Sequence, residues 1–234
     1  MKYKALIKKL SLDDADLEKI KTAVQKAESK TSGEIALAIA AESSCYAFWE
    51  LAAALGTSLL LLVCLFPLAP QIYTWLGRMF WGEEPWYLAA FFLALCAAMV
   101  LLLYAAYNIP AIDRLVIPRV ARQQAVTARA LRYFAQSGVY ATENRSGVLI
   151  FVSYFEREVR ILADTGLNQK ISPDLWNLVS DEISDSFAKG NVAEAFITAV
   201  QRCGDLLAEN FPAHGAKSNE LPDGLVVLEN DRWI

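Results

Sequence analysis

Two long uncharged stretches dominate the pattern of apolar and polar positions along this chain. They cover residues 51–77 and 85–112, and neither contains an Asp, Glu, Lys or Arg. A helix of roughly 20 apolar residues crosses the hydrocarbon core of a bilayer, so each stretch is long enough to do so. The segment that links them, residues 78–84, is too short to fold alone. The pattern therefore predicts a transmembrane hairpin at residues 46–112, with both flanking segments on the same side of the membrane.

The flank before the hairpin has helical and then strand-like periodicity. Apolar residues recur at helical spacing through residues 11–32, with Ser11 as the expected N-cap and Gly33 at the end. Residues 34–41 then have the pattern of a buried strand, which has no partner in its own segment. Since a lone strand is not stable, it is expected to pair with another part of the chain.

The flank after the hairpin supplies the partner strands. Residues 147–153 and 158–163 are apolar runs joined by a short turn, which predicts an antiparallel pair. A basic helix precedes this pair, and two amphipathic helices follow it. We therefore expect one α/β domain, a small mixed sheet flanked by helices, built from residues 1–45 and 113–212 and interrupted by the transmembrane hairpin. The polar tail, residues 213–234, is expected to be loosely ordered.

Charge sets the expected orientation of the hairpin. Lysines crowd the segment before the first stretch and arginines the segment after the second, whereas the linking segment carries only Arg78 beside Glu83 and Glu84. By the positive-inside rule both termini are expected in the cytoplasm, which predicts a multi-pass protein of the cell (inner) membrane. The net charge of −4 argues against nucleic-acid binding, which needs a basic face. The spans lack polar residues along a pathway, which disfavours a transporter subunit.

Small and polar residues near the start of the first stretch have expected roles in the membrane. Glu50 is expected to reach the lipid headgroups, and the alternative is an intramembrane functional acid. Ala52 and Gly56 are small and would let the two helices pack closely. The cysteines form no CxxC pair and are expected to be small buried side chains; they are Cys45, Cys64, Cys96 and Cys203.

Carboxylates are the strongest candidates for chemistry, because the sequence has no GxSxG, P-loop, HExxH or EF-hand motif and its only histidine, His214, lies in the tail. Asp164 follows the second strand of the pair, Glu143 precedes the first, and Asp181 and Asp185 share one helical face. A divalent cation such as Ca²⁺ takes about 6–8 oxygen ligands, so these four residues are the candidate metal ligands. The alternative is a strand-end turn at Asp164 and a solvated helix face.

Arginines near the same strands are the candidate anion-binding residues. Arg145 precedes the first strand, Arg157 lies in the turn, and Arg160 is in the second strand. The alternation of Glu156, Arg157 and Glu158 is also typical of a surface that only needs to be soluble, so this alternative stays open.

The order of motifs resembles the TPM domain family. The chain carries SGEIALAIA at residues 32–40, then NRSGVLIFVSYFEREVRILADTGLNQKIS at residues 144–172, and then FAKGNVAEAFITAVQRCGDLL at residues 187–207. The most specific part is the succession of a Ser-Gly-Glu-Ile strand, a Gly-Val-Leu strand and a strand that ends in Asp-x-Gly-Leu. The NELPD segment, residues 219–223, is similar to a bacterial membrane-protein branch of the family with the same inserted hairpin.

The resemblance implies a TPM-like α/β sandwich and several functions. The family is associated with photosystem II repair, with an acid phosphatase activity in a plant member and with accessory roles beside membrane receptors, and some members resemble calcium binders. We therefore expect a membrane accessory protein that contacts lipid and binds or maintains another membrane protein. The alternative is a metal-assisted acid-type phosphatase, and whether the domain is an enzyme stays open. Ca²⁺ or another divalent cation is the only cofactor that the resemblance implies, and the oligomeric state is not predicted.

Overall fold

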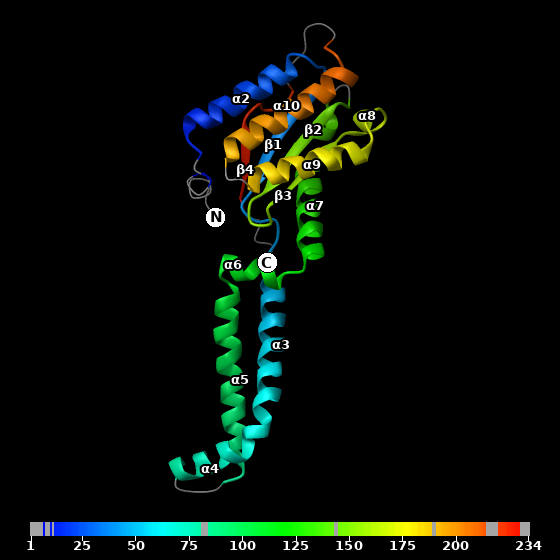
Figure 1. The fold of residues 1–234 in the computed structure, drawn as a ribbon. Helices are drawn as coiled ribbons and strands as arrows, with labels where there is room; N and C mark the ends of the chain where they lie inside the picture. The colour runs from blue at the N-terminus through cyan, green and yellow to red at the C-terminus, as the bar shows by residue number, and fades with distance from the viewer. Residues whose placement is uncertain are drawn as a thin grey trace. The chain divides into compact units, whose positions relative to one another are not determined.

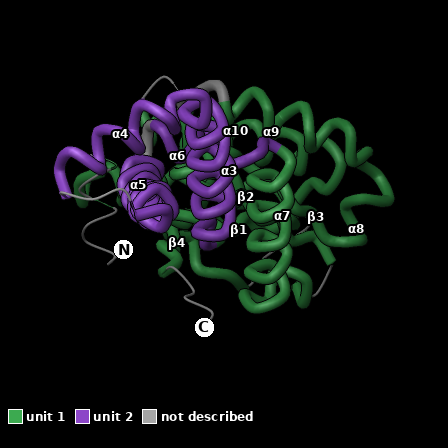
Figure 2. The backbone as a smooth tube through the Cα atoms, turned by 90° about the horizontal axis from the view of Figure 1, so that it is seen from below, with its two compact units in different colours: residues 1–44, 120–234 green, residues 45–119 purple. Residues whose placement is uncertain are grey.

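The structure of the chain is a computed structural model, in which the chain forms two compact units. It describes residues 7, 10, 12–80, 84–142, 145–188, 191–213 and 220–229. Unit 1 contains residues 1–44 and 120–234, and unit 2 contains residues 45–119; Figure 2 colours them separately. The second unit is therefore inserted into the first.

The described part of unit 1 is built around a mixed sheet with strand order β3-β2-β1-β4. Its strands are β1 (Glu34–Ala40), β2 (Gly147–Ser153), β3 (Glu158–Ala163) and β4 (Leu225–Leu228). β1 runs parallel to both β2 and β4, whereas β3 is antiparallel to β2. The strand that precedes the insertion thus lies between two strands that follow it, which confirms that the two flanks share one sheet.

Helices cover both faces of this sheet (Figure 1). One face carries α2 (Asp14–Glu28), α9 (Pro173–Ala188) and α10 (Val192–Asn210), and α10 packs against both of the others. The other face is covered by α7 (Arg119–Gln136). The predicted fold class, a small mixed sheet flanked by helices, is confirmed.

The two faces of β1 are packed differently because successive side chains point to opposite sides of a strand. Ile35, Leu37 and Ile39 belong to the core under the three-helix layer. Of the alternate positions, Ala36, Ala38 and Ala40 lie with Val126 and Ala130 of α7, and the first is the buried Glu34. All seven residues of β1 are buried, as the apolar pattern of this strand predicted.

The end of the chain contributes a strand that the sequence did not predict. Residues 213–234 were expected to be a loosely ordered tail, but β4 pairs with β1 over residues 225–228. Leu221 is buried before it, and Nη2 of the buried Arg129 on α7 donates to the backbone oxygen of Glu229 after it, over 2.7 Å. The tail prediction is therefore wrong for this segment.

Unit 2 holds two helices that are long and apolar enough to cross a membrane. Its elements are α3 (Ala47–Leu65), the 3₁₀ turn η1 (Phe66–Leu68), α4 (Ala69–Phe80), α5 (Trp86–Tyr107) and α6 (Pro110–Val116). The first apolar stretch is not one straight span, because the chain turns at η1 and α4 runs across the end of the α3–α5 pair (Figure 1). Pro67 and Pro70 lie at this break, where neither can donate a backbone hydrogen bond.

The contact between α3 and α5 uses small residues other than the predicted ones. Ala54 and Ser58 are fully buried, one helical turn apart on the side of α3 that faces α5. Ala52 and Gly56 are exposed, and a Cβ added to Gly56 would meet nothing within 4 Å. The prediction that Ala52 and Gly56 allow close packing is therefore wrong. Small residues do form the contact between the helices, but they are Ala54 and Ser58, on another face of α3.

Glu50 also has a different position from the expected one. Its side chain is buried, and Oε2 accepts a hydrogen bond from Nδ2 of Asn108 over 2.8 Å. Seven residues further along α3, the hydroxyls of Thr57 and Tyr107 lie 3.0 Å apart. These polar contacts join the start of α3 to the end of α5, so Glu50 does not extend toward headgroups but links the two helices.

Candidate functional site

The carboxyl ends of the two central parallel strands hold a buried group of hydrogen-bonded side chains. β1 and β2 are paired in register, and their last residues, Ala40 and Ser153, are partners. In open α/β sheets ligands bind outside the carboxyl ends of parallel strands, because the loops that leave these ends surround a common space. This edge is therefore the place where the fold favours a site.

Three residues form the hydrogen-bonded group. The hydroxyl of the fully buried Ser153 donates to Oε2 of Glu156 over 2.5 Å, and the backbone N–H of Ser43 donates to Oε1 of the same carboxylate over 2.9 Å. The hydroxyl oxygens of Ser43 and Ser153 lie 2.6 Å apart. Glu156 itself is only 3% exposed, although it lies in a charged turn.

The direction of these hydrogen bonds follows from the number of protons. The hydroxyl of Ser153 has a single proton, which it donates to Oε2 of Glu156. The hydroxyl of Ser43 must then donate to Ser153 in their 2.6 Å contact. Glu156 thus orients both hydroxyls, and the half-buried Ser43 is the member nearest solvent.

The hydrogen bonds of this arrangement hold a chain segment in place. Backbone hydrogen bonds extend the same contact: Tyr154 donates to the oxygen of Ala40 and Phe155 to that of Ala41, each over 3.0 Å. The network therefore fixes the segment 41–44, which leads directly to α3.

The predicted ligand Asp164 lies at the opposite end of the sheet. It follows β3, and because β3 is antiparallel to β2, it sits beside Gly147 at the start of β2, to whose oxygen its N–H donates over 2.9 Å. Oδ1 of Asp164 accepts from the backbone N–H of Thr165 over 2.6 Å and caps the short helix α8 (Thr165–Asn168). Oδ2 is buried and has no hydrogen-bond partner among the described residues.

The structure does not bring the four proposed metal ligands together in the part that it describes. Glu143 lies outside the described residues, and only the backbone of Asp185 is described. Asp181 is exposed on α9. No group of three His, Cys, Asp or Glu side chains that could hold a metal ion occurs among the described residues. The metal site thus stays a prediction, with Asp164 as the member that has an available buried oxygen.

The face of α9 beside Asp181 has another role, which the sequence did not reveal. Ser180 and Ser184 lie one turn apart and accept hydrogen bonds from the backbone N–H groups of Ile161 and Val159, over 3.2 and 3.3 Å. β3 is at the edge of the sheet, and its outward N–H groups would otherwise lack strand partners. The two serines therefore close this edge.

Two of the three predicted anion-binding arginines lie at opposite ends of β2, and the third, Arg160, pairs with Glu158 over 2.9 Å. Arg145 precedes the strand and Arg157 lies in the turn after it, so a seven-residue strand, about 23 Å long, separates them. One small anion cannot contact both. Each has a left-handed backbone, with φ of 51° at Arg145 and 55° at Arg157, so both residues shape turns.

The glycines of the sequence motifs mark places where backbones meet. A Cβ on Gly147 would collide with the carbonyl oxygen of Val139, and one on Gly166 would lie 2.5 Å from the carbonyl oxygen of Arg145. At Gly33 it would lie 3.2 Å from the carbonyl oxygen of Ser146. All three lie at the Asp164 end of the sheet. The motifs therefore describe a tightly packed corner, and packing explains their glycines without a ligand.

A groove between α9 and α10 exposes apolar side chains on the outer surface of unit 1. Leu175 and Leu178 of α9 are 37% and 56% exposed, and together with Leu206 of α10 they line a cavity of about 270 Å³. Glu182 and Arg202 lie at its rim, with their charged atoms 3.6 Å apart. Asp205 and Glu209 also line the cavity, so its described lining combines apolar and charged side chains, as protein-binding surfaces do.

Comparisons with known proteins agree with this fold. A model of the TPM domain matches residues 112–206, a segment that contains β2, β3, the helices α7 to α9 and most of α10. The NMR structure of BA42 protein from the psychrophilic bacterium Bizionia argentinensis is similar to this chain with a TM-score of 0.54 and 19% sequence identity, over 92% of this chain and 94% of that one. No curated protein sequence matches. At this identity the likeness to BA42 concerns the fold alone.

Proposed function

We propose that this chain, which contains a TPM domain, is a membrane-anchored accessory protein of the cell (inner) membrane whose domain binds another membrane protein. The hairpin of α3 and α5 is the anchor, and the TPM domain is the binding module. A metal-assisted phosphatase has less support, because the described residues contain no group of three potential metal ligands.

The position of β1 in the sheet is the main observation that supports the proposed membrane hairpin. β1 precedes the insertion, yet it pairs with β2 on one side and β4 on the other. A sheet forms only among strands in the same compartment, so the insertion must leave and return on one side of the membrane. An even number of crossings satisfies this condition, and α3 and α5 supply two.

The lengths and surfaces of the two helices support the same proposal. α3 has 19 residues and α5 has 22, which correspond to about 28 and 33 Å at roughly 1.5 Å per residue. The hydrocarbon core of a bilayer is about 30 Å thick. Large apolar side chains on their outer faces are exposed, including Leu59, Leu93 and Leu102. In water this surface would drive aggregation, whereas lipid would cover it.

Positive charge favours a cytoplasmic TPM domain. The flanks of the hairpin are rich in Lys and Arg, and the segment between α3 and α5 contains Arg78 as its single basic residue. Fusions of a fluorescent protein and of a periplasm-dependent alkaline phosphatase test this topology. We expect fluorescence from fusions at residues 1 and 234 and phosphatase activity from a fusion at residue 82. Termini on opposite sides would overturn the proposal, because the sheet could not then form.

The α9–α10 groove is the surface that we propose for the partner protein. We expect Leu178→Glu to reduce co-purification of the partner after mild detergent extraction, because the substitution replaces an exposed apolar side chain of the groove with a charged one. Leu131→Glu is the matched control, since Leu131 is a similarly exposed leucine on α7, on the other face of the sheet. A chain that always purifies alone, or equal loss in both variants, would contradict this role of the groove.

A further inference from the structure

The first apolar stretch is longer than a single crossing requires. A straight helix over Ala47–Phe80 would have 34 residues and a length of about 51 Å, well beyond the roughly 30 Å of a hydrocarbon core. The chain instead ends α3 at Leu65, after 19 residues, and begins α4 four residues later. The 12 residues of α4 are therefore not needed for the crossing and are available for another role.

The residues of α4 divide into a polar and an apolar face. Gln71, Thr74 and Arg78 recur at spacings of three and four, which places them on one side of the helix. The opposite side carries Ile72, Leu76 and Phe80, and the exposed Trp75 and Met79 lie between the two faces. A helix with this division lies in the plane of a membrane interface, with the apolar face in the acyl region and the polar face toward headgroups and water.

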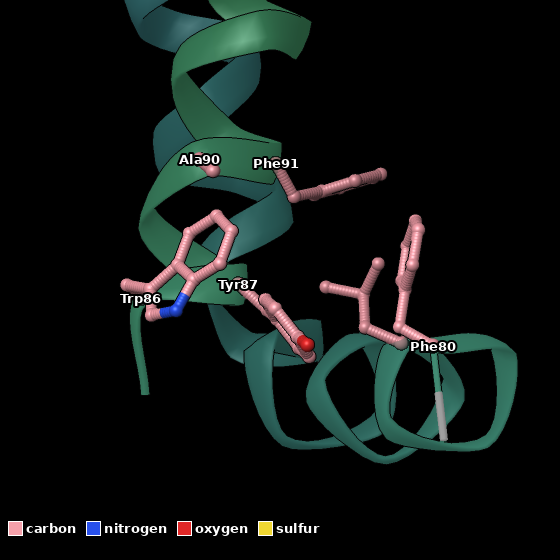
Figure 3. Close-up of a pocket in the computed structure, with 6 residues that line it drawn as sticks. Phe80, Trp86, Tyr87, Ala90 and Phe91 are labelled. Atoms are coloured by element: carbon pink, nitrogen blue, oxygen red, sulfur yellow. The ribbon is translucent and has the colours of Figure 1, made fainter. Parts of the chain in front are cut away.

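An apolar pocket lies between α4 and the first turns of α5 (Figure 3). It has a volume of about 330 Å³ and is lined by Leu76, Phe80, Trp86, Tyr87, Ala90 and Phe91. Each wall consists of residues one helical turn apart, Leu76 with Phe80 on α4 and Tyr87 with Phe91 on α5. Among the described lining residues Ala90 is the small one, and its short side chain leaves the space open.

The lining selects the chemical class of the occupant. Among the described residues that line it none is charged, and their only side-chain polar atoms are the hydroxyl of Tyr87 and the indole nitrogen of Trp86. An anion, a sugar or a nucleotide would lose its hydration here without gaining hydrogen bonds. A hydrocarbon chain fits, because it needs only apolar contact.

The surroundings of the pocket identify the source of that hydrocarbon. Trp75 of α4 is 54% exposed and lies beside Phe91 of the lining, with ring centroids 6.5 Å apart. Trp86, another lining residue, is also exposed. Arg78 projects from the polar face of α4, where a phosphate group of a lipid would pair with it. We propose that α4 lies in the membrane interface and that this pocket holds one acyl chain of a membrane phospholipid. The inference rests on the proposed membrane hairpin.

Native mass spectrometry of the full chain, released from detergent with added dioleoylphosphatidylcholine, tests the pocket. We expect a one-to-one lipid adduct, reduced roughly tenfold by Ala90→Phe, which fills the pocket. Ala98→Phe is the matched control, the same change at another exposed alanine of α5, and the adduct should persist. Ala90→Leu serves as a milder second variant in case the Phe variant misfolds. Equal adducts in all variants would overturn the proposal, as would a protein dimer that is lost only in Ala90→Phe, because it would identify a second copy as the occupant.

Cysteine labelling tests the in-plane position of α4 separately. In full-length chain with its four cysteines replaced by alanine, we expect Gln71→Cys and Thr74→Cys to react with a membrane-impermeant maleimide, and Ile72→Cys and Phe80→Cys to be protected. Protection of all four positions would place α4 within the bilayer and overturn the inference. If the fusions show both crossings while labelling or adducts fail, only this inference is wrong. If the crossings themselves are absent, both proposals are wrong.

Discussion

Ser43 and Glu156 are 113 residues apart in the chain, and the backbone N–H of Ser43 donates to Oε1 of Glu156 over 2.9 Å. The hairpin insertion and α7 lie between them in sequence. The contact therefore joins the last residues before the insertion to the turn between β2 and β3. It makes a carboxylate in a short charged turn responsible for the geometry of the segment that leads into the first apolar helix.

Removing this carboxylate should destabilise unit 1. Glu156→Ala leaves the buried hydroxyl of Ser153 and the N–H of Ser43 without their acceptor, and we expect the free energy of unfolding to fall by about 1.5–3 kcal/mol. Glu156→Gln keeps one acceptor oxygen and should lose less. Asp181→Asn, an exposed change, is the control and should stay within about 0.5 kcal/mol. Urea unfolding followed by Trp176 fluorescence measures all three; equal midpoints for Glu156→Ala and the control would contradict the role of the network.

The second prediction concerns Gly147, where two backbone segments approach closely. Gly147→Ala forces a Cβ against the carbonyl oxygen of Val139, and this oxygen belongs to backbone that cannot rotate away. We expect a loss of at least about 3 kcal/mol or failure to fold. Gly224→Ala is the matched control, because a Cβ there meets nothing within 4 Å. Soluble yield and thermal midpoint compare the two variants, and similar values would refute the packing explanation of the motif glycine.

The face of α3 that contacts α5 can be tested by exchanging small residues. Ala54→Leu should separate the helices, because Ala54 is fully buried between them, whereas Gly56→Leu should be tolerated on the exposed side. Ser58→Ala should be neutral or slightly stabilising, since the buried Ser58 hydroxyl has no hydrogen-bond partner among the described residues. Disulfide trapping between cysteines placed on α3 and α5 reports the packing. Stronger disruption by Gly56→Leu than by Ala54→Leu would show that the helices meet on the other face.

Cys203 predicts a specific dependence of stability on alkaline pH. Burial raises the pKa of its thiol from an ordinary value of 9.0 to about 12 in the folded chain. Between these values the folded state keeps a proton that the unfolded state has lost, so stability is complete below about pH 9 and falls toward pH 12. The decline should approach 1.4 kcal/mol per pH unit, about one proton.

Comparison with Cys203→Ala isolates this effect. The variant should lose the Cys203 part of the decline, while other alkaline groups such as Tyr133, whose pKa burial also raises, contribute equally to both proteins. A thiol reagent at pH 8 should label the exposed Cys45 at once and Cys203 only after unfolding. Rapid labelling of Cys203 in the folded chain, or identical pH curves, would contradict the burial. The expectation that all four cysteines are buried is wrong for Cys45 and Cys64, which are exposed.

Substitutions of Asp164 distinguish a helix-capping role of this residue from a metal-binding role. Asn caps helices as well as Asp does, so Asp164→Asn should leave stability nearly unchanged, whereas Asp164→Ala should cost about 1 kcal/mol. Calorimetric titration of the full chain with Ca²⁺ gives the second readout. Binding that disappears in Asp164→Asn, while the fold is intact, would assign the buried Oδ2 to a cation. Unchanged titrations in both proteins would leave the cap as the role of this residue.

The main division of the fold could be predicted from the sequence because its signals are local. Uninterrupted apolar runs marked the hairpin helices, and the apolar run at residues 34–41 marked β1, whose lack of a local partner required pairing across the insertion. β4 escaped prediction because its run is four residues long and lies in a polar tail. Its pairing depends on β1, which is 188 residues distant in the register Leu37 with Leu225.

The polar network escaped prediction for a different physical reason. The alternation of charges at Glu156, Arg157 and Glu158 is the same whether the turn faces water or folds back on the sheet. Only the register that places Ser153 beside Ala40 brings Ser43 to this carboxylate. Likewise, the apolar content of residues 51–77 does not distinguish a long span from a span followed by an in-plane helix; the prolines and the spacing of Gln71, Thr74 and Arg78 carry that information.

The central position of β1 has a consequence for how the protein is made. A ribosome delivers β1 before its neighbours, and more than a hundred residues must follow before β2 emerges. Until then, both edges of this apolar strand are open. If the hairpin enters a bilayer as proposed, insertion has to be completed before the sheet can form, and a nascent chain whose hairpin stalls would be a substrate for chaperones and proteases.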